Sequence, residues 1–171
     1  MPRIRICGFT LLELLIALLI FSLGLIGMAG LMMLSVKTSH SAYLRTQASF
    51  IAQAMVERMR ANINGVWGGS YNGSYSDTPG TAIPACNSGG GCDPAAVAER
   101  DQSAFTAALA QFLPDSSATI NCKTTTTPTS TDLLSQRPYD GICLMSITWS
   151  ESPLTRGSEV VPYTLNWAFQ P

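Results

Sequence analysis

The side chains on which most enzyme sites depend are scarce in this sequence. Histidine occurs once, at His40, and a lone histidine on a helix far more often faces solvent or packs than takes part in catalysis. The chain contains no cluster of metal-ligating residues, no Gly-x-Ser-x-Gly turn and no Gly-Lys-Ser phosphate loop. We therefore predict that the protein is not an enzyme, and that it has no catalytic residue, no cofactor and no metal site.

Charge is also scarce, and neither sign dominates. Charged residues make up 12% of the chain, and the formal net charge is −1. A protein that binds nucleic acid concentrates lysine and arginine on one surface, and this balance of charges provides no such concentration. We expect no nucleic-acid partner.

Two further absences, of charge and of proline, define a long helix at the start of the chain. Positions 14–34 hold 21 residues without a charge, enough for a helix of about 31 Å that spans a bilayer. No proline occurs between Pro2 and Pro79 to interrupt it. Arg3 and Arg5 precede the apolar run, which favours a cytoplasmic start. The sequence thus predicts a single-pass membrane anchor with the rest of the chain outside the cytoplasm.

The helical pattern continues beyond the apolar run. Apolar residues recur at steps of three and four, which places them on one face of a helix: Leu44, Ala48, Ile51, Met55 and Met59. Arg45, Glu57 and Arg60 lie off this face. We predict one helix over 9–63, whose second half is an amphipathic stem. The apolar face of the stem needs a cover, and the remainder of the chain is the nearest candidate.

Composition changes abruptly after Asn62. Residues 65–80 are rich in glycine, serine and tyrosine without periodicity, which predicts a long surface loop. Trp67, Tyr71 and Tyr75 fall in this stretch. Packing is the favoured explanation of these aromatic residues, and an adhesive or partner surface is the alternative. Residues 64–171 are predicted to form the head of the protein.

Within the head, one helix and three strands are expected. Asp93 and Pro94 form an N-cap followed by proline at the first helical position, and Pro114 ends the helix. The expected face of this helix is apolar apart from Asp101: Val97, Phe105, Ala108, Leu109 and Phe112. Alternation predicts strands through Ala118–Cys122, Cys143–Trp149 and Tyr163–Phe169. The predicted class is α+β, with the stem helix packed on a small antiparallel sheet.

Five cysteines occur, one before the apolar run and four after it. Cys7 is at the start, and the head contains Cys86, Cys92, Cys122 and Cys143. If the anchor delivers the head into an oxidising compartment, these four are expected in disulfides. Three pairings are possible. We favour Cys86 with Cys92 and Cys122 with Cys143, because each pair closes a local loop, and two crossed bridges remain open.

Glu13 is an acidic residue at the edge of the apolar run, where a charge costs free energy. It follows a basic leader and a Gly8-Phe9-Thr10-Leu11 sequence. In this spacing the first 30 residues resemble the type IV pilin class of precursors, which includes the pseudopilins of type II secretion. Scattered later positions resemble PilV-type minor pilins, the type IV pilus modification proteins: Gly24 to Leu31, Glu57 to Asn62, Cys92 to Pro94, Ala98, Asp101, and Leu113 with Pro114.

The resemblance implies how the start of the chain is processed. In that class a prepilin peptidase cuts after the glycine and methylates the new amine, which implies a leader at 1–8, cleavage between Gly8 and Phe9, and N-methyl-Phe9. Glu13 then implies assembly, because in the class this carboxylate compensates the amine of a neighbouring subunit. Pairing of Glu13 with its own chain's amine, or its reach to the membrane interface, is the alternative. Cys7 is expected to leave with the leader.

The resemblance also implies fold, location and partners. It implies a pilin fold and a minor pilin of the type IV pilus that joins a priming or tip complex, with a part in pilus biogenesis, twitching motility and adhesion. Its implied partners are other minor pilins, the major pilin, the peptidase, the inner-membrane assembly platform and a tip adhesin. The location that the resemblance implies is a cytoplasmic N-terminus with a periplasmic head, and later a place at the pilus tip.

Three competing interpretations remain. A minor pseudopilin of a type II secretion system shares the same first 30 residues, and an adhesive or DNA-binding pilin would carry its function in the head. An ordinary secretory signal would end near Ala29, because Gly27-Met-Ala29 fits a small-x-small cleavage site. Glu13 and the length of the apolar run argue against the signal peptide.

Overall fold

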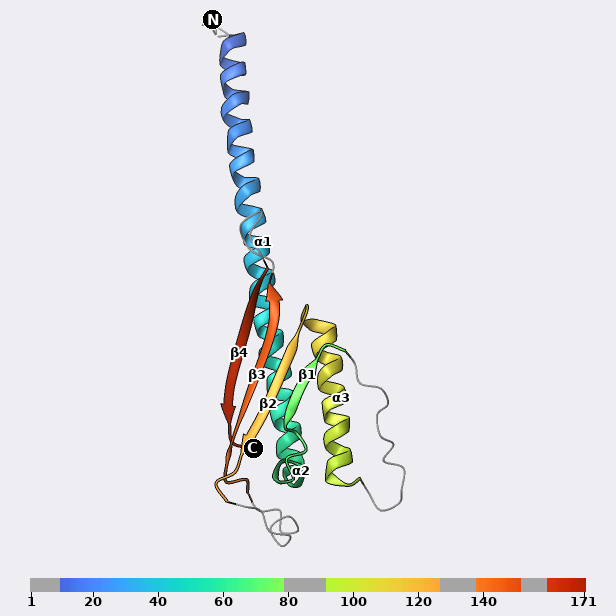
Figure 1. Ribbon diagram of the computed structural model, residues 1–171. Coiled ribbons are helices and arrows are strands. Elements are labelled where there is room, and N and C mark those ends of the chain that lie inside the picture. Colours follow the sequence, from blue (N-terminus) through green and yellow to red (C-terminus); the bar gives the residue numbers. More distant parts are fainter. Residues whose placement is uncertain (1–9, 79–91, 127–137, 152–159) are drawn as a thin grey trace, which may run out of the picture. The chain divides into compact units, whose positions relative to one another are not determined.

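The computed structural model describes residues 10–78, 92–126, 138–151 and 160–171 (Figure 1). The chain divides into two compact units, Met1–His40 and Ser41–Pro171. A single helix, α1 (Leu11–Ala61), contributes to both.

The described part of the first unit is helical from Leu11 and has no buried residue. Its large apolar side chains, from Leu11 to Val36, are about half to four-fifths exposed. The helix is long and apolar enough to cross a membrane by length and composition. A Cβ added at Gly24, Gly27 or Gly30 would meet open space beside the helix, and the helix runs through these glycines without interruption.

In the second unit the remainder of α1 forms the stem. The predicted face is confirmed, since all five of its residues are buried, together with Ala52 and Val56. The helix ends at Ala61 because the next residue, Asn62, takes a non-helical backbone conformation with φ −122° and ψ 58°. The Asn62 side chain then accepts a hydrogen bond from the Gly65 N–H at 3.4 Å and caps a new short helix.

The prediction of a long surface loop after Asn62 was wrong for the part of it that the structure describes. This part contains α2 (Ile63–Trp67) and β1 (Gly73–Ser76), with Trp67 and Tyr71 buried. The packing interpretation of the aromatic residues is confirmed: the Trp67 ring meets Tyr139 edge-on at 5.0 Å between centroids, and Tyr75 meets Phe105 at 5.6 Å. Burial of the aromatic rings, which dominates core energetics, outweighs the weak local propensity of glycine and serine.

The second helix of the head is α3 (Pro94–Phe112), and it begins as predicted. The Asp93 carboxylate accepts a hydrogen bond from the Ala95 N–H at 3.4 Å, and Pro94 occupies the first turn. Leu113 has an extended backbone and ends the helix before Pro114. The buried face is Ala98, Asp101, Phe105, Thr106 and Leu109. Phe112, which was expected on this face, is exposed instead.

In the part of the chain that the structure describes, four antiparallel strands form one sheet in the order β1-β2-β3-β4 (Figure 1). The three predicted strands are confirmed as β2 (Ser117–Lys123), β3 (Ile142–Glu151) and β4 (Val161–Phe169). Alternate residues of β2 and β3 are buried in the core with the stem and α3, and their neighbours face outward. The α+β class predicted from the sequence is therefore the observed one.

One predicted disulfide is present in the sheet. Cys122 of β2 and Cys143 of β3 are direct partners in the strand register and form a bridge with 3.9 Å between their Cα atoms. The other predicted pair, Cys86 with Cys92, includes Cys86, which lies outside the described residues. Next to the bridge, Gly141 lies against the main chain, and a Cβ there would lie 2.0 Å from the Lys123 carbonyl oxygen.

Candidate functional site

The start of α1 combines a polar cap with an acidic residue. The hydroxyl oxygen of Thr10 accepts a hydrogen bond from the Glu13 N–H at 3.3 Å, and the Thr10 carbonyl accepts from the N–H groups of Glu13 and Leu14. Glu13 lies in the first turn, where the positive end of the helix dipole favours a carboxylate. Its side chain is exposed in the single chain. Gly8 and Phe9, the predicted processing residues, lie outside the described residues.

Beyond Glu13, the helix has an apolar surface, and two of its polar side chains are satisfied within the helix. Ser22, the clearly polar residue of positions 14–34, donates its hydroxyl to the Leu19 carbonyl at 2.8 Å. Thr38 donates to the carbonyls of Leu34 and Ser35. An unsatisfied polar group is costly in an apolar medium, so this arrangement suits lipid or neighbouring helices. Glu13 is an exposed acidic residue at the start of this surface.

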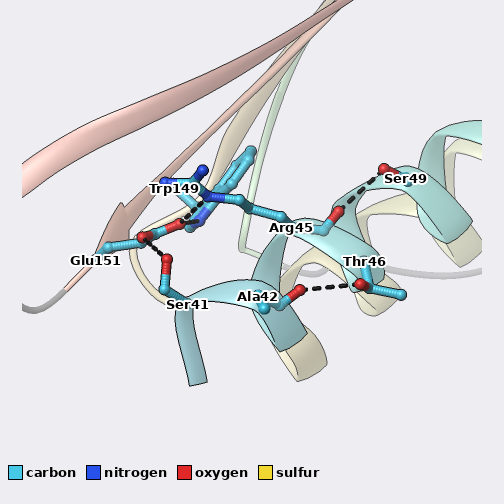
Figure 2. A network of polar contacts seen from close by, with 7 residues as sticks. All are labelled: Ser41, Ala42, Arg45, Thr46, Ser49, Trp149 and Glu151. Carbon is cyan, nitrogen blue, oxygen red and sulfur yellow. Dashed lines mark hydrogen bonds and ion pairs between the residues drawn. The ribbon is translucent and has the colours of Figure 1, made fainter. Parts of the chain in front are cut away.

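Near the start of the stem, a buried carboxylate joins the helix to the sheet (Figure 2). Glu151, at the end of β3, is 5% exposed. It accepts hydrogen bonds from the Ser41 hydroxyl and from the Trp149 indole N–H, the latter at 3.0 Å, and pairs with the Arg45 guanidinium at 3.4 Å. The Arg45 guanidinium also lies over the Tyr163 ring of β4, 4.6 Å from its centroid. This network attaches the stem to β3 and β4.

A second buried carboxylate joins the far end of the stem to α3. Asp101 pairs with the Arg58 guanidinium at 3.2 Å and accepts a hydrogen bond from the Tyr71 hydroxyl at 2.6 Å. That hydroxyl accepts a hydrogen bond in turn from the Asn62 amide at 2.9 Å. Burial and the neighbouring Asp101 carboxylate raise the pKa of Tyr71 well above its ordinary value. Asp101 is thus a positioning residue of the head.

The comparisons with known proteins bear on the start of the chain. Residues 3–29 match the family model described as the prokaryotic N-terminal methylation motif. Neither curated proteins nor solved structures give a match to the chain. The chain has a prepilin-like start. The match covers Gly8, Phe9 and Glu13, and it supports a type IV pilin-like or pseudopilin-like protein, a structural class that is anchored in the membrane and associated with pili.

Different sequence signals point to the prepilin-like start and to the two carboxylate networks. Gly8, Phe9 and Glu13 were identified through the resemblance of their spacing to that of the type IV pilin class. Asp101 is the polar residue on an otherwise apolar helix face. This position indicates that its carboxylate has a buried partner, but it does not identify that partner. Glu151 follows the alternation of β3 onto its buried face, and this was a usable signal that sequence reasoning missed.

No metal centre is evident in the described ranges 10–78, 92–126, 138–151 and 160–171. No group of three or more His, Cys, Asp or Glu side chains there lies in a position to hold a metal ion. Both buried carboxylates are instead held by hydroxyl, indole or guanidinium groups of the chain itself.

Proposed function

We propose that this chain is a minor pilin of the type IV pilus. The observation that carries the proposal is the methylation motif at 3–29, with Glu13 in the first turn of a helix that has no other charge until Lys37. In this proposal a prepilin peptidase removes the leader 1–8 by cutting between Gly8 and Phe9 and methylates the amine of Phe9. Residues 9–63 are then the anchor and stem, and 64–171 are the head.

Glu13 acts during assembly. After cleavage it is the fifth residue of the chain, in an apolar surface where an unpaired charge is costly. The cationic amine of a neighbouring subunit lowers that cost when the two groups meet, so that charge pairing sets the register between subunits. The exposed position of the Glu13 side chain supports this role, because the carboxylate is available to another chain.

The protein waits in the inner membrane with its N-terminus in the cytoplasm and its head in the periplasm. Arg3 and Arg5 support this orientation, and so does the Cys122–Cys143 disulfide, because disulfides persist in oxidising compartments. From there it joins other minor pilins and the major pilin through the assembly platform, in a priming or tip complex. The head contributes to biogenesis, twitching motility and adhesion.

Mass spectrometry of protein extracted from membranes tests the processing step. We expect an N-terminus at Phe9 that is heavier by one methyl group. A mature chain that starts at Gly30 would indicate an ordinary secretory signal and would remove the pilin proposal.

A substitution tests the role of the carboxylate. We expect Glu13→Ala to be cleaved and methylated normally but to be absent from purified pili, because the neighbouring amine loses its partner. Ser22→Ala is the matched control, since it removes a polar group that is already satisfied inside the same helix. Normal incorporation of Glu13→Ala would contradict charge pairing while leaving the processing step intact.

A minor pseudopilin of a type II secretion system is the second candidate, because the matched motif is shared by pilins and pseudopilins. Deletion of the gene separates the two. Loss of twitching with normal secretion supports the pilus, whereas loss of secretion with normal twitching supports the secretion system.

A further inference from the structure

The free edge of β4 is the feature of the head from which a further role can be inferred. Within the described ranges β4 pairs with β3 on one side and with no strand on the other. It is nine residues long and contains no charged residue. Charges, which commonly protect an edge strand from pairing, are thus absent from it, and a proline occurs only near its start, at Pro162. The opposite edge, β1, has four residues, and its Tyr75 ring packs on Phe105 of α3.

The register shows which backbone groups this edge presents. In an antiparallel ladder, alternate residues direct both their N–H and C=O groups to the same neighbouring strand. The backbone N–H and C=O of Cys122 both bond to the Asn72 side chain, on the β1 side of β2. Its register partner Cys143 therefore directs its own backbone N–H and C=O away from β2 and toward β4. Cys143 lies opposite Phe169. Phe169 and the residues at steps of two before it therefore bond to β3, and Thr164, Asn166 and Ala168 direct their backbone groups to the free edge.

A second hydrogen bond gives the same assignment. The Ser150 N–H donates to the Pro114 carbonyl, on the β2 side, at 3.0 Å. Ser150 therefore does not use this N–H for its β4 partner, Pro162. Pro162 has the same parity as Thr164 and faces the free edge, where its missing N–H costs no bond of the existing sheet. We call the free edge over Thr164–Ala168, which begins after Pro162, the unpaired platform.

The side chains of this platform define what fits on it. Leu165 and Trp167 are on the core-facing row of β4 and are only partly buried, whereas Thr164 and Asn166 are exposed on the opposite row. Tyr163 precedes them and is covered by the Arg45 guanidinium. An added strand would satisfy the backbone groups and extend the apolar cover of Leu165 and Trp167. The absence of charge on β4 suits an uncharged strand.

We propose that the β4 edge binds an edge strand of another pilin-type subunit, in antiparallel pairing over Thr164–Ala168. This inference rests on the proposed function, because it takes both subunits to be anchored in one membrane. β4 runs in the same direction as the stem: Tyr163 lies near Arg45, and Gln170 bonds to the carbonyl of Tyr139. Tyr139 in turn packs on Trp67, beyond the end of the stem.

This direction excludes one occupant. Two copies that paired their β4 strands antiparallel would have opposed stems, whereas anchors in one bilayer start both stems on the same side. The strand that binds to β4 must therefore run opposite to the stem of its own subunit. In this fold β1 and β3 run that way, but β3 lies inside the sheet and β1 has only four residues, too few to cover Thr164–Ala168. We therefore assign the occupant to a longer edge strand of that direction in a different pilin-type subunit.

Photo-cross-linking in cells that assemble the full-length chain tests the assignment. A benzoylphenylalanine at Ala168 is expected to form an adduct with another protein that carries an N-terminal methylation motif, mapped by mass spectrometry to one of its strands. Leu144 is the matched control position, because it lies opposite Ala168 in the register, is exposed, and is one strand inward. We expect no adduct from it.

Two edge variants test the role of backbone pairing. Asn166→Pro removes an outward N–H without removing a bond to β3, and Asn166→Lys adds a charge to the edge. Each is expected to lower the yield of the Ala168 adduct about tenfold, the effect of about one lost hydrogen bond. Ser146→Lys, directly opposite Asn166 on β3, is expected to leave the yield unchanged. Equal yields in the edge variants and Ser146→Lys would overturn the assignment.

A cross-linker at Leu25 in the anchor separates this inference from the proposed function. Adducts from Leu25 with pilin-type subunits, without any from Ala168, would overturn the edge assignment and leave the minor pilin proposal standing. Adducts from Ala168 with a second copy of this chain alone would also overturn it. If neither position gives an adduct with a pilin-type subunit, both proposals fail.

Discussion

Tyr71 is fully buried although it carries a hydroxyl group, and that hydroxyl connects three parts of the head. It donates to Asp101 of α3 and accepts from Asn62, which joins α1 to α2. Tyr71→Phe removes both bonds and leaves a buried carboxylate with one partner fewer. We expect a loss of about 1–2 kcal/mol in the free energy of unfolding, measured by urea titration of the full-length chain in detergent.

The matched control for this change is Tyr163→Phe. The Tyr163 ring lies under Arg45 and against Trp149, but its hydroxyl bonds to no described residue. It should alter the free energy of unfolding by less than about 0.5 kcal/mol. Equal effects of the two substitutions would show that the Tyr71 hydroxyl has no special part.

Tyr75 makes the head sensitive to alkali. Burial raises the pKa of Tyr75 to about 12, from the ordinary value of 10.0. Below pH 10 the Tyr75 hydroxyl is protonated in both the folded and the unfolded chain, so its contribution to the free energy of unfolding is fully present there. Between pH 10 and 12 the unfolded chain releases the proton while the folded chain keeps it, and stability falls. We expect alkaline unfolding in this window, followed by phenolate absorbance, with a smaller slope in Tyr75→Phe. An unchanged pH dependence of unfolding in Tyr75→Phe would contradict the assignment of this sensitivity to Tyr75.

Asp101 shows where sequence reasoning ends at the residue scale. Its place on an otherwise apolar helix face was evident from the spacing. Its partners were not, because Arg58 and Tyr71 lie 43 and 30 positions away in the chain. Contacts at such separations depend on tertiary packing, which no local pattern encodes.

The pairing of β2 with β3 rests partly on their disulfide. Cys122 and Cys143 are separated by 21 positions, and the bridge restricts the unfolded chain. Replacing both by alanine is expected to lower the free energy of unfolding by roughly 2–4 kcal/mol, measured by guanidinium titration. Cys7→Ser serves as the control and should have no effect, because Cys7 precedes the predicted cleavage. A loss below about 1 kcal/mol would mean that the strands pair without its help.

Glu151 attaches the start of the stem to β3, and its removal should loosen that end alone. Glu151→Gln keeps the shape but weakens the bonds to Ser41 and Trp149 and abolishes the ion pair with Arg45. We expect a loss of about 1–3 kcal/mol, with faster hydrogen exchange in a peptide spanning 41–48 than in one spanning 55–61. Glu57→Gln, in an exposed pair with Arg60, should change neither peptide. Uniform acceleration along the stem would contradict a local attachment.

At the scale of elements, periodic segments were predictable and short ones were not. The stem face, α3 and the three long strands follow from apolar spacing, because burial of one face dominates their stability. α2 and β1 are five and four residues long and lie in a stretch that is rich in glycine and serine. These two elements form because Trp67 and Tyr71 are buried by residues distant in the chain. They have no periodicity of their own from which they could be predicted.

For the molecule as a whole, the division at Ser41 separates the apolar start of the chain from the unit that contains the core. The start of the chain has a motif that matches a known family model, and the proposed processing and charge pairing would both require fixed local positions. Its neighbours in an assembly are other chains, and no pattern in one sequence identifies them. The second unit, Ser41–Pro171, contains every described buried residue, so its fold should not depend on the helix before it.

Shortened chains test this independence. A chain that begins at Thr38 keeps Ser41, Leu44 and Arg45, and we expect it to be soluble, monomeric and cooperatively folded by circular dichroism and gel filtration. A chain that begins at Ser49 loses the partners of Glu151 and the buried side chain of Leu44, and should be less stable by roughly 2–5 kcal/mol. Equal melting of the two would show that the Glu151 network adds nothing. Failure of the Thr38 chain to fold would instead mean that the first unit is required for the fold of the second.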